Sequence, residues 1–194
     1  MKYTKIRETA FDEIQLNAGV LSAEFTPASG EIGDIIAATS GGISFEATPT
    51  YTDFGEDIDN CPKNTKELKK LDSWEVKMSG TFVTVTKDSA KQMVGAADAT
   101  QESTVDKITP RNDVADTDFE DIWLVGDYSS KNGEVNGGFI AIHMFNALST
   151  GGFKLQTADK SKGTMSFEFT GHYSIADQTK VPFEIYIKTG ADEA

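Results

Sequence analysis

Apolar and polar residues alternate with a period of two over much of this chain, which is typical of strands that bury one face. The clearest run places Met165, Phe167, Phe169 and Tyr173 on one face, with polar residues between them. A helix of 3.6 residues per turn would spread these side chains around its surface. The chain is therefore expected to be mainly β.

Further segments predict a sheet of several short strands. Strands are expected at 43–51 and from 73 to 85, where the apolar residues change face and predict a bulge near Gly80 or cover on both faces. Apolar runs predict other strands at 19–25, 122–125, 139–145, 153–157, 164–173 and 183–187. The glycine pairs at 41–42, 137–138 and 151–152 are interpreted as turns that enter strands, and they fit tight turns or a close approach of backbone. This pattern is typical of a β-sandwich or barrel.

One segment departs from the period of two. Ala90, Met93, Val94 and Ala97 recur at helical spacing. We expect a short flanking α-helix at about 87–97, with Thr86 or Asp88 as the N-cap and Gly95 weakening its end.

A long inter-strand loop is expected at about 53–71, and its charges are ordered. Its first limb is acidic, at Asp53, Glu56, Asp57 and Asp59, and its second limb is basic, at Lys63, Lys66, Lys69 and Lys70. Opposite limbs of neighbouring copies could pair in a head-to-tail contact. The alternative is a loop that is merely solvated.

The composition argues against nucleic-acid binding and against common catalytic sites. A net charge of -13 opposes phosphate binding. His143 and His172 lie in predicted strands, and Cys61 is the only cysteine, so no catalytic, cofactor-binding or metal-binding residue is expected. The acidic run 113–121 lacks the spacing of a calcium loop, although looser calcium binding stays an alternative.

The 194 residues are expected to form a single domain with an N-terminal arm at about 1–18. No apolar run is long enough for a membrane span or a secretory signal, so synthesis in the cytoplasm without membrane insertion is expected.

Seven ordered blocks of sequence resemble the major tail tube proteins of siphophages, the long-tailed bacteriophages. The blocks are 16–20 (LNAGV), 38–51 (ATSGG and the strand after it), 70–76 (KLDSWEV), 118–128 (DFEDIWLVGDY), 138–142 (GFIAI), 146–153 (NALSTGGF) and 167–173 (FEFTGHY). Their common order makes the resemblance specific, although each block alone would be weak.

The resemblance implies a structural, non-enzymatic protein of the phage tail, located in the virion. Copies of such a protein form hexameric rings that stack into a tube, around a tape-measure protein that DNA later replaces. Tail terminator and distal tail or baseplate proteins are implied as further partners, and no cofactor is implied. DNA would pass without adhering, because an acidic wall does not attract phosphates.

Two sets of residues become candidates under this resemblance. The charged residues of the 53–71 loop would stack one ring on the next. The lumen would be lined by the strands at 43–51, 73–85, 153–157 and 164–173, with Glu46, Glu75 and Glu168 facing it. Ordinary solvent exposure is the alternative reading of these glutamates.

Other classes of protein share parts of the pattern. A carbohydrate-binding or adhesion β-sandwich could stack sugars on Tyr51, Trp74, Trp123 or Tyr128. An acidic-pair hydrolase has weaker support, because no pair of carboxylates stands out. A secretion-system tube protein would share nearly all of these features.

Overall fold

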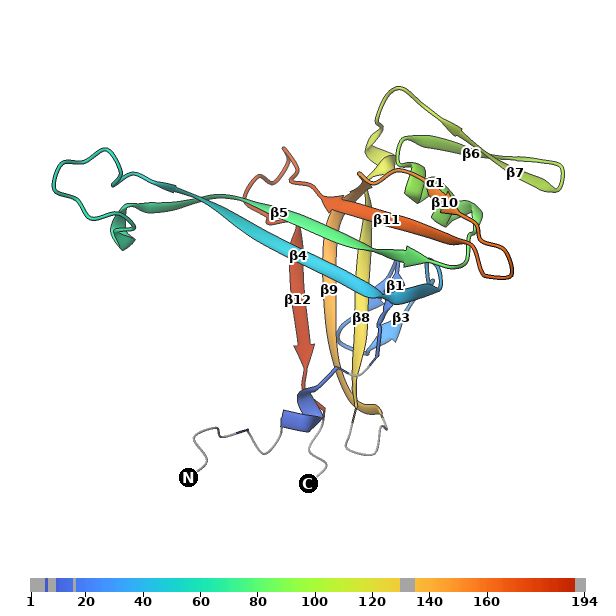
Figure 1. The fold of residues 1–194 in the computed structure, drawn as a ribbon, viewed down its shortest axis with the longest axis horizontal. Helices are drawn as coiled ribbons and strands as arrows, with labels where there is room; N and C mark the ends of the chain where they lie inside the picture. Colours follow the sequence, from blue (N-terminus) through green and yellow to red (C-terminus); the bar gives the residue numbers. More distant parts are fainter. Residues whose placement is uncertain (1–5, 7–9, 16, 130–134, 191–194) are drawn as a thin grey trace.

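The computed structural model describes residues 6, 10–15, 17–129 and 135–190, so half of the expected N-terminal arm at 1–18 lies outside the described residues. The fold is mainly β, as predicted, with an eight-stranded antiparallel sheet, two small hairpins and one α-helix (Figure 1). The elements of the main sheet are β1 (Val20–Ser22), β4 (Thr39–Asp53), β5 (Lys69–Phe82), β8 (Glu120–Ser129), β9 (Val135–Ser149), β10 (Lys154–Gln156), β11 (Thr164–Gly171) and β12 (Phe183–Lys188). The hairpins are β2 (Phe25–Thr26) with β3 (Glu31–Ile32) and β6 (Ala97–Glu102) with β7 (Val105–Pro110), and the helix is α1 (Lys87–Val94).

The main sheet bends at β9, which has β8 on one edge and both β12 and β11 on the other. The upright strands β8, β9 and β12 are crossed by β11, β5 and β4 (Figure 1). Between the two halves lies a core that includes Met78 from β5, Phe169 from β11, Ile122 from β8 and Met144 from β9. Among the described residues the sheet does not close into a barrel.

Every predicted strand overlaps an observed one. The observed β4, β8 and β9 are longer than predicted, β1, β10 and β11 are shorter, and β5 lies at 69–82 instead of 73–85. The apolar runs mark only the buried middle of β4, β8 and β9, and polar residues continue the pairing at their ends. The glycine pairs at 41–42 and 137–138 lie inside β4 and β9 instead of in turns, and a close approach of backbone is found at Gly138, where an added Cβ would lie 2.5 Å from the backbone N of Gly190. The pair at 151–152 does lie in the turn between β9 and β10, as expected.

The expected change of face in β5 does not occur within the strand. Val76, Met78 and Phe82 all lie in the core, and the bulge is on the partner strand β4, between Thr39 and Ile43. Gly80 takes the core-facing position between Met78 and Phe82. Because glycine has no side chain, the ring of Phe167, its cross-strand partner on β11, fits over it.

Replacing Gly80 by alanine is expected to lower the free energy of unfolding by about 1–3 kcal/mol, as overpacking does in other cores. An added Cβ would lie 2.7 and 3.0 Å from two ring atoms of Phe167, which is buried and cannot move freely. Urea unfolding followed by circular dichroism measures the difference. Gly163→Ala is the matched control, because its nearest neighbours would lie at 3.6 Å. Equal stabilities of the two variants would contradict this account.

The helix α1 begins and ends where two local signals place it. Thr86 is the N-cap, and its side chain and that of Ser89 each accept a hydrogen bond from the other residue's backbone N–H. Gly95 adopts a φ of 82° and ends the helix three residues earlier than the expected boundary, so Ala97 belongs to β6. Met93 packs in the core, and its carbonyl accepts a hydrogen bond from Ser149 Oγ at 2.7 Å.

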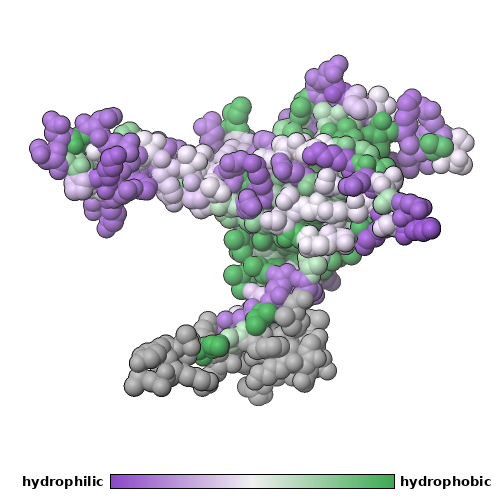
Figure 2. All heavy atoms as spheres, viewed as in Figure 1, coloured by the Kyte–Doolittle hydropathy of each residue, from purple (hydrophilic) through white to green (hydrophobic). Residues whose placement is uncertain are grey.

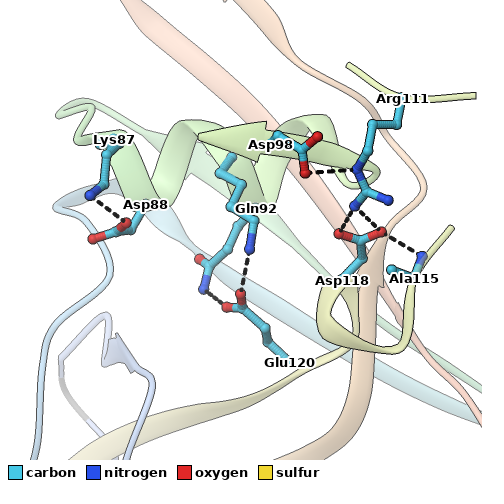
Figure 3. Close-up of polar contacts among 9 residues, drawn as sticks. Lys87, Asp88, Gln92, Asp98, Arg111, Ala115, Asp118 and Glu120 are labelled. Atoms are coloured by element: carbon cyan, nitrogen blue, oxygen red, sulfur yellow. Dashed lines mark hydrogen bonds and ion pairs between the residues drawn. The ribbon is translucent and has the colours of Figure 1, made fainter. Parts of the chain in front are cut away.

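The hairpin of β6 and β7 was not predicted, and a buried ion pair fixes the segment that follows it (Figure 3). The side chain of Asp118 is fully buried and accepts two hydrogen bonds from Arg111 Nη2, at 2.6 and 2.7 Å. It also accepts a hydrogen bond from the backbone N–H of Ala115 at 2.9 Å. Asp98 on β6 lies 3.0 Å from Arg111 Nε. These contacts hold residues 111–118 against the start of β8.

The acidic run at 113–121 is divided among separate partners. Asp118 binds Arg111, Glu120 lies 3.6 Å from Lys91 and accepts a hydrogen bond from Gln92, and Asp121 binds His143. Figure 3 shows Glu120 and Asp118 turned toward different elements. The run therefore has local structural roles in the folded chain.

Candidate assembly surfaces

One surface is the outer face of the four strands β10, β11, β5 and β4, in that order. The other face of β4, β5 and β11 packs on the core through Phe45, Val76, Met78, Phe167 and Phe169, whereas the three residues of β10 are exposed. Because strand side chains alternate, the intervening residues point to solvent. They are mostly serine, threonine and glutamate, with examples at Ser44, Glu46, Thr48, Glu75, Lys77, Ser79, Ser166, Glu168 and Thr170.

The three glutamates expected to face a lumen lie together on this outer face. Glu46 is directly opposite Lys77, Thr48 is opposite Glu75, and Glu168 is opposite Ser79. Lys77 Nζ lies 2.5 Å from Glu75 Oε1. The hydrogen bond and the charge of Glu75 raise the pKa of Lys77, and the charges of Glu168 and Glu46 add to this effect. Three carboxylates thus surround one ammonium group, and the face is acidic.

Both sides of this four-stranded layer end in an open edge in the described part of the chain, and on the β10 side that edge is limited to Lys154–Gln156, because β9 pairs with the other end of β11. On one side β4 pairs only with β5, and on the other β10 pairs only with β11. Open edges present unpaired N–H and C=O groups that can pair with another chain. Residues 44, 46, 48 and 50 on β4 are all exposed.

The far half of the β4–β5 hairpin extends beyond the body of the molecule as an arm (Figure 1). The pairing continues to Asp53 and Lys69, so both of these residues, with Lys70, belong to strands. The connecting segment is residues 54–68, shorter than the expected loop at 53–71, and it contains a 3-10 turn at Lys66–Leu68.

Asp53 organises the tip of the arm. Its two carboxylate oxygens accept hydrogen bonds from the backbone N–H groups of Gly55, at 2.9 Å, and Asn64, at 2.8 Å. These bonds lower the pKa of Asp53, with smaller help from the charges of Lys69 and Lys63. Cys61 is a half-buried free thiol in the same tip. Asp53 therefore has a structural role within the tip.

The remaining charges of the tip point to solvent. Glu56, Asp57, Asp59, Lys63 and Lys66 are exposed. Lys66 lies 3.8 Å from its neighbour Glu67, and Lys70 lies 3.8 Å from Asp72. Among the described residues, no salt bridge joins the acidic limb 56–59 to the basic limb 63–70. Both limbs are available to a partner.

A second open surface lies beneath the arm, where Figure 2 shows apolar residues gathered over the upright strands. Phe183 at the start of β12 packs against Phe45 and Trp74, with ring centroids 5.7 and 5.4 Å away. Ile185 and Ile187 continue the same face of β12 and are 51% and 63% exposed. The apolar layer under β4 and β5 thus continues along β12, where its side chains are exposed to solvent.

Both histidines have structural partners. His143 stacks on Trp123 with centroids 3.8 Å apart and donates a hydrogen bond from Nε2 to Asp121 at 3.1 Å. His172 lies edge-on to Phe119, and its Nδ1 is 3.1 Å from the carbonyl oxygen of Asn146. The hydrogen bond from His143 lowers the pKa of Asp121, and the backbone N–H of Asn146 acts in the same direction against the effect of burial.

Asp121 is expected to contribute to acid lability. Because its pKa in the folded chain is below the ordinary value of 3.8, its contribution is complete above that value and is lost as the pH falls through the folded pKa. Asp121→Asn should lower stability at pH 7 and flatten the fall between pH 5 and pH 2. Urea titrations at several pH values measure this. Asp159→Asn, at an exposed residue, is the control, and an unchanged acid slope in Asp121→Asn would contradict the assignment.

In the described part of the chain, no helix has the length and apolar character needed to cross a bilayer. No protein-family model matches the sequence, and no curated protein matches it. Among solved structures, similarity was found to the tube-terminating cap of the anti-feeding prophage, determined by cryo-electron microscopy. The TM-score is 0.44 and the identity is 10%, over 96% of this chain and 97% of that chain.

Proposed function

We propose that this chain is a structural subunit of a phage tail, in which copies join edge to edge into hexameric rings and the rings stack into a tube. The observation that carries the proposal is the four-stranded layer β10–β11–β5–β4. It has one face on the core, one polar and acidic face in solvent, and two open edges. A monomer with such edges risks uncontrolled association, and ring closure by identical copies removes that risk.

The acidic outer face suits the wall of a DNA conduit. Double-stranded DNA carries about one charge per 1.7 Å of its axis, and lysine or arginine side chains would hold it by releasing counterions. Glu46, Glu75 and Glu168 would instead repel a duplex within a Debye length of about 8 Å. The polar serines and threonines between them add no phosphate-binding charge.

The arm and the apolar face supply the remaining contacts in this proposal. The arm tip, with its two oppositely charged limbs, would contact the next ring, and the apolar face of β12 would be covered by other tail components or copies. The partners are then further copies, the tape-measure protein, a tail terminator and distal tail or baseplate proteins. The location is the virion, after synthesis in the bacterial cytoplasm, and the role is not enzymatic.

The carbohydrate-binding alternative is weakened by the positions of its aromatic residues. Trp123 is 7% exposed between His143 and Phe25, and Tyr128 is 8% exposed. Trp74 packs on Phe183, which leaves Tyr51, near the arm tip, as the exposed candidate. A platform for sugars needs exposed aromatic faces side by side.

Negative-stain microscopy of the purified, concentrated protein tests the proposal. Six-fold rings or tubes are expected, with or without seeding by tail initiators. A monomer that never assembles and that binds a glycan array would instead support the carbohydrate-binding alternative. A secretion-system tube protein would also form tubes, so the genes beside this one distinguish that case.

Reversing Glu75 and Glu168 to lysine is expected to slow genome ejection on the order of tenfold, because a basic wall attracts the passing duplex. Both residues lie on interior strands, so the edges stay unchanged. Timing of ejection from assembled phage at 0.15 M and 1 M salt measures the effect, which should shrink at high salt.

The matched control for this variant is the reversal of Glu102 and Asp106 in the β6–β7 hairpin, which makes the same change of net charge elsewhere. Ejection at the wild-type rate from phage carrying the Glu75 and Glu168 reversals would argue that these residues face ordinary solvent.

A further inference from the structure

We propose that β10 of one copy pairs antiparallel with the outer edge of β4 of the next copy, and that Lys154 then lies beside Glu46. This pairing rests on the proposed function and specifies its ring contact. Strand direction, register, charge and an apolar side chain each bear on it.

Strand direction favours this pairing. The layer β10–β11–β5–β4 alternates in direction at every step, since each neighbouring pair is antiparallel. It contains an even number of strands, so β10 and β4 run in opposite directions at its two ends. When identical copies follow one another around a ring, β10 of one copy meets β4 of the next antiparallel, and the alternation is never broken.

The register follows from the tilt of strands in a closed barrel. Within the chain Lys154 is opposite Ser166, which is opposite Thr81, at the level of the β4 bulge. Strands about 4.8 Å apart, tilted by about 36–45°, shift by about 14–19 Å over four strands, or about four to six residues. A shift toward the arm, the direction in which β4 continues, brings Lys154 level with positions 46–48.

The face and the charges agree with this register. Lys154 and Glu46 both lie on the outer face, because the cross-strand partners Ser166 and Lys77 lie on it. Neither residue is in a salt bridge within the described residues, and Lys77, the cross-strand partner of Glu46, is held by Glu75. The segment from β10 to β11 offers Lys154 and Lys160 against Asp159 as its one acid, while Lys162 donates a hydrogen bond to Ser40 Oγ of its own chain. A basic edge therefore meets an acidic one.

Leu155 supplies an apolar contact on the inner side of the same edge. It is 56% exposed and shares the core-facing side of the layer with Met165, its cross-strand partner. Pairing with β4 of the next copy would place Leu155 in line with Phe45 and Ala47, which are half-buried on that side. The contact removes apolar surface from water on both copies.

Charge reversal at the two positions tests the pairing. Glu46→Lys and Lys154→Glu should each raise the critical concentration for ring and tube formation about tenfold or more, since each sets like charges side by side. The double variant Glu46→Lys, Lys154→Glu restores opposite charges and should assemble within about threefold of wild type. Sedimentation and negative-stain microscopy measure both, and circular dichroism checks that these exposed substitutions leave the fold intact.

Glu168→Lys is the matched control, because it makes the same charge change on the same face but on an interior strand, and it should assemble like wild type. If wild type assembles and either single variant assembles equally well, or the double variant does not recover, the pairing is wrong while the proposed function stands. Wild-type protein that never assembles, even when seeded, overturns the proposed function and the pairing together.

Discussion

Arg111→Met is expected to lower the free energy of unfolding by about 3–5 kcal/mol, the loss typical when one partner of a buried ion pair is removed. The side chain of Asp118 is fully buried, and two of its three hydrogen bonds come from Arg111. Without the guanidinium, the carboxylate keeps its desolvation cost and one backbone N–H. Urea unfolding at pH 7 measures the loss. A deficit in Arg111→Met below about 1 kcal/mol would contradict the assignment.

Two further variants control this prediction. Asp113 lies 3.8 Å from the same guanidinium but is 82% exposed, so Asp113→Asn should change stability by less than about 0.5 kcal/mol. The double variant Arg111→Met, Asp118→Leu removes both buried charges and should recover part of the loss. The same contacts hold residues 111–118, the segment that leads into β8, so the stability of the double variant also bears on assembly.

The strands that bury a face could be predicted from the sequence, because burial imposes the period of two. Val76, Met78 and Phe82 show it on β5, and Met165, Phe167 and Phe169 show it on β11. The same alternation placed Glu46, Glu75 and Glu168 on the opposite side from the core, and the structure brings them together around Lys77. Whether that face lines a lumen stays a prediction.

Features that depend on pairing instead of burial were missed. The β6–β7 hairpin is mostly exposed and polar, so residues 97–110 carry no apolar alternation. Gly41 and Gly42 have φ values of 82° and 85°, which suits a turn as well as a bulge, and only the register of β4 against β5 distinguishes the two. One signal for the ion pair was present in the sequence, because Arg111 is a lone cation beside an acidic run.

The open edges could not be predicted from the sequence because no local pattern states which strand ends a sheet. β4 and β11 show similar alternation, yet β4 lies at an edge and β11 lies between two neighbours. The difference arises from the order of strands in space. The contact between β10 and β4 of another copy is accordingly an inference that needs the structure.

Replacing residues 54–68 by Asn-Gly is expected to leave the fold intact and to reduce tube formation about 100-fold. Asp53 and Lys69 are the last paired residues, and Asn-Gly suits a two-residue hairpin between them. The hydrogen bonds of the tip lie within the arm, at Asp53, Gly55, Asn64 and Thr65, so the body loses no contact. If the tip joins one ring to the next, the truncation removes this contact from every copy in a ring. Stacking then loses the added affinity that several simultaneous contacts provide.

Rings without tubes in negative-stain images would be the expected result, with unfolding in urea close to that of wild type. Cys61→Ser is the control, because it alters the same tip without shortening it or changing its charge. Long tubes from the truncated protein would show that the arm tip does not join rings, and the two charged limbs would then be a solvated turn. A truncated protein that forms neither rings nor tubes would place the arm in the ring contact itself, since edge pairing through β4 and β10 is independent of residues 54–68.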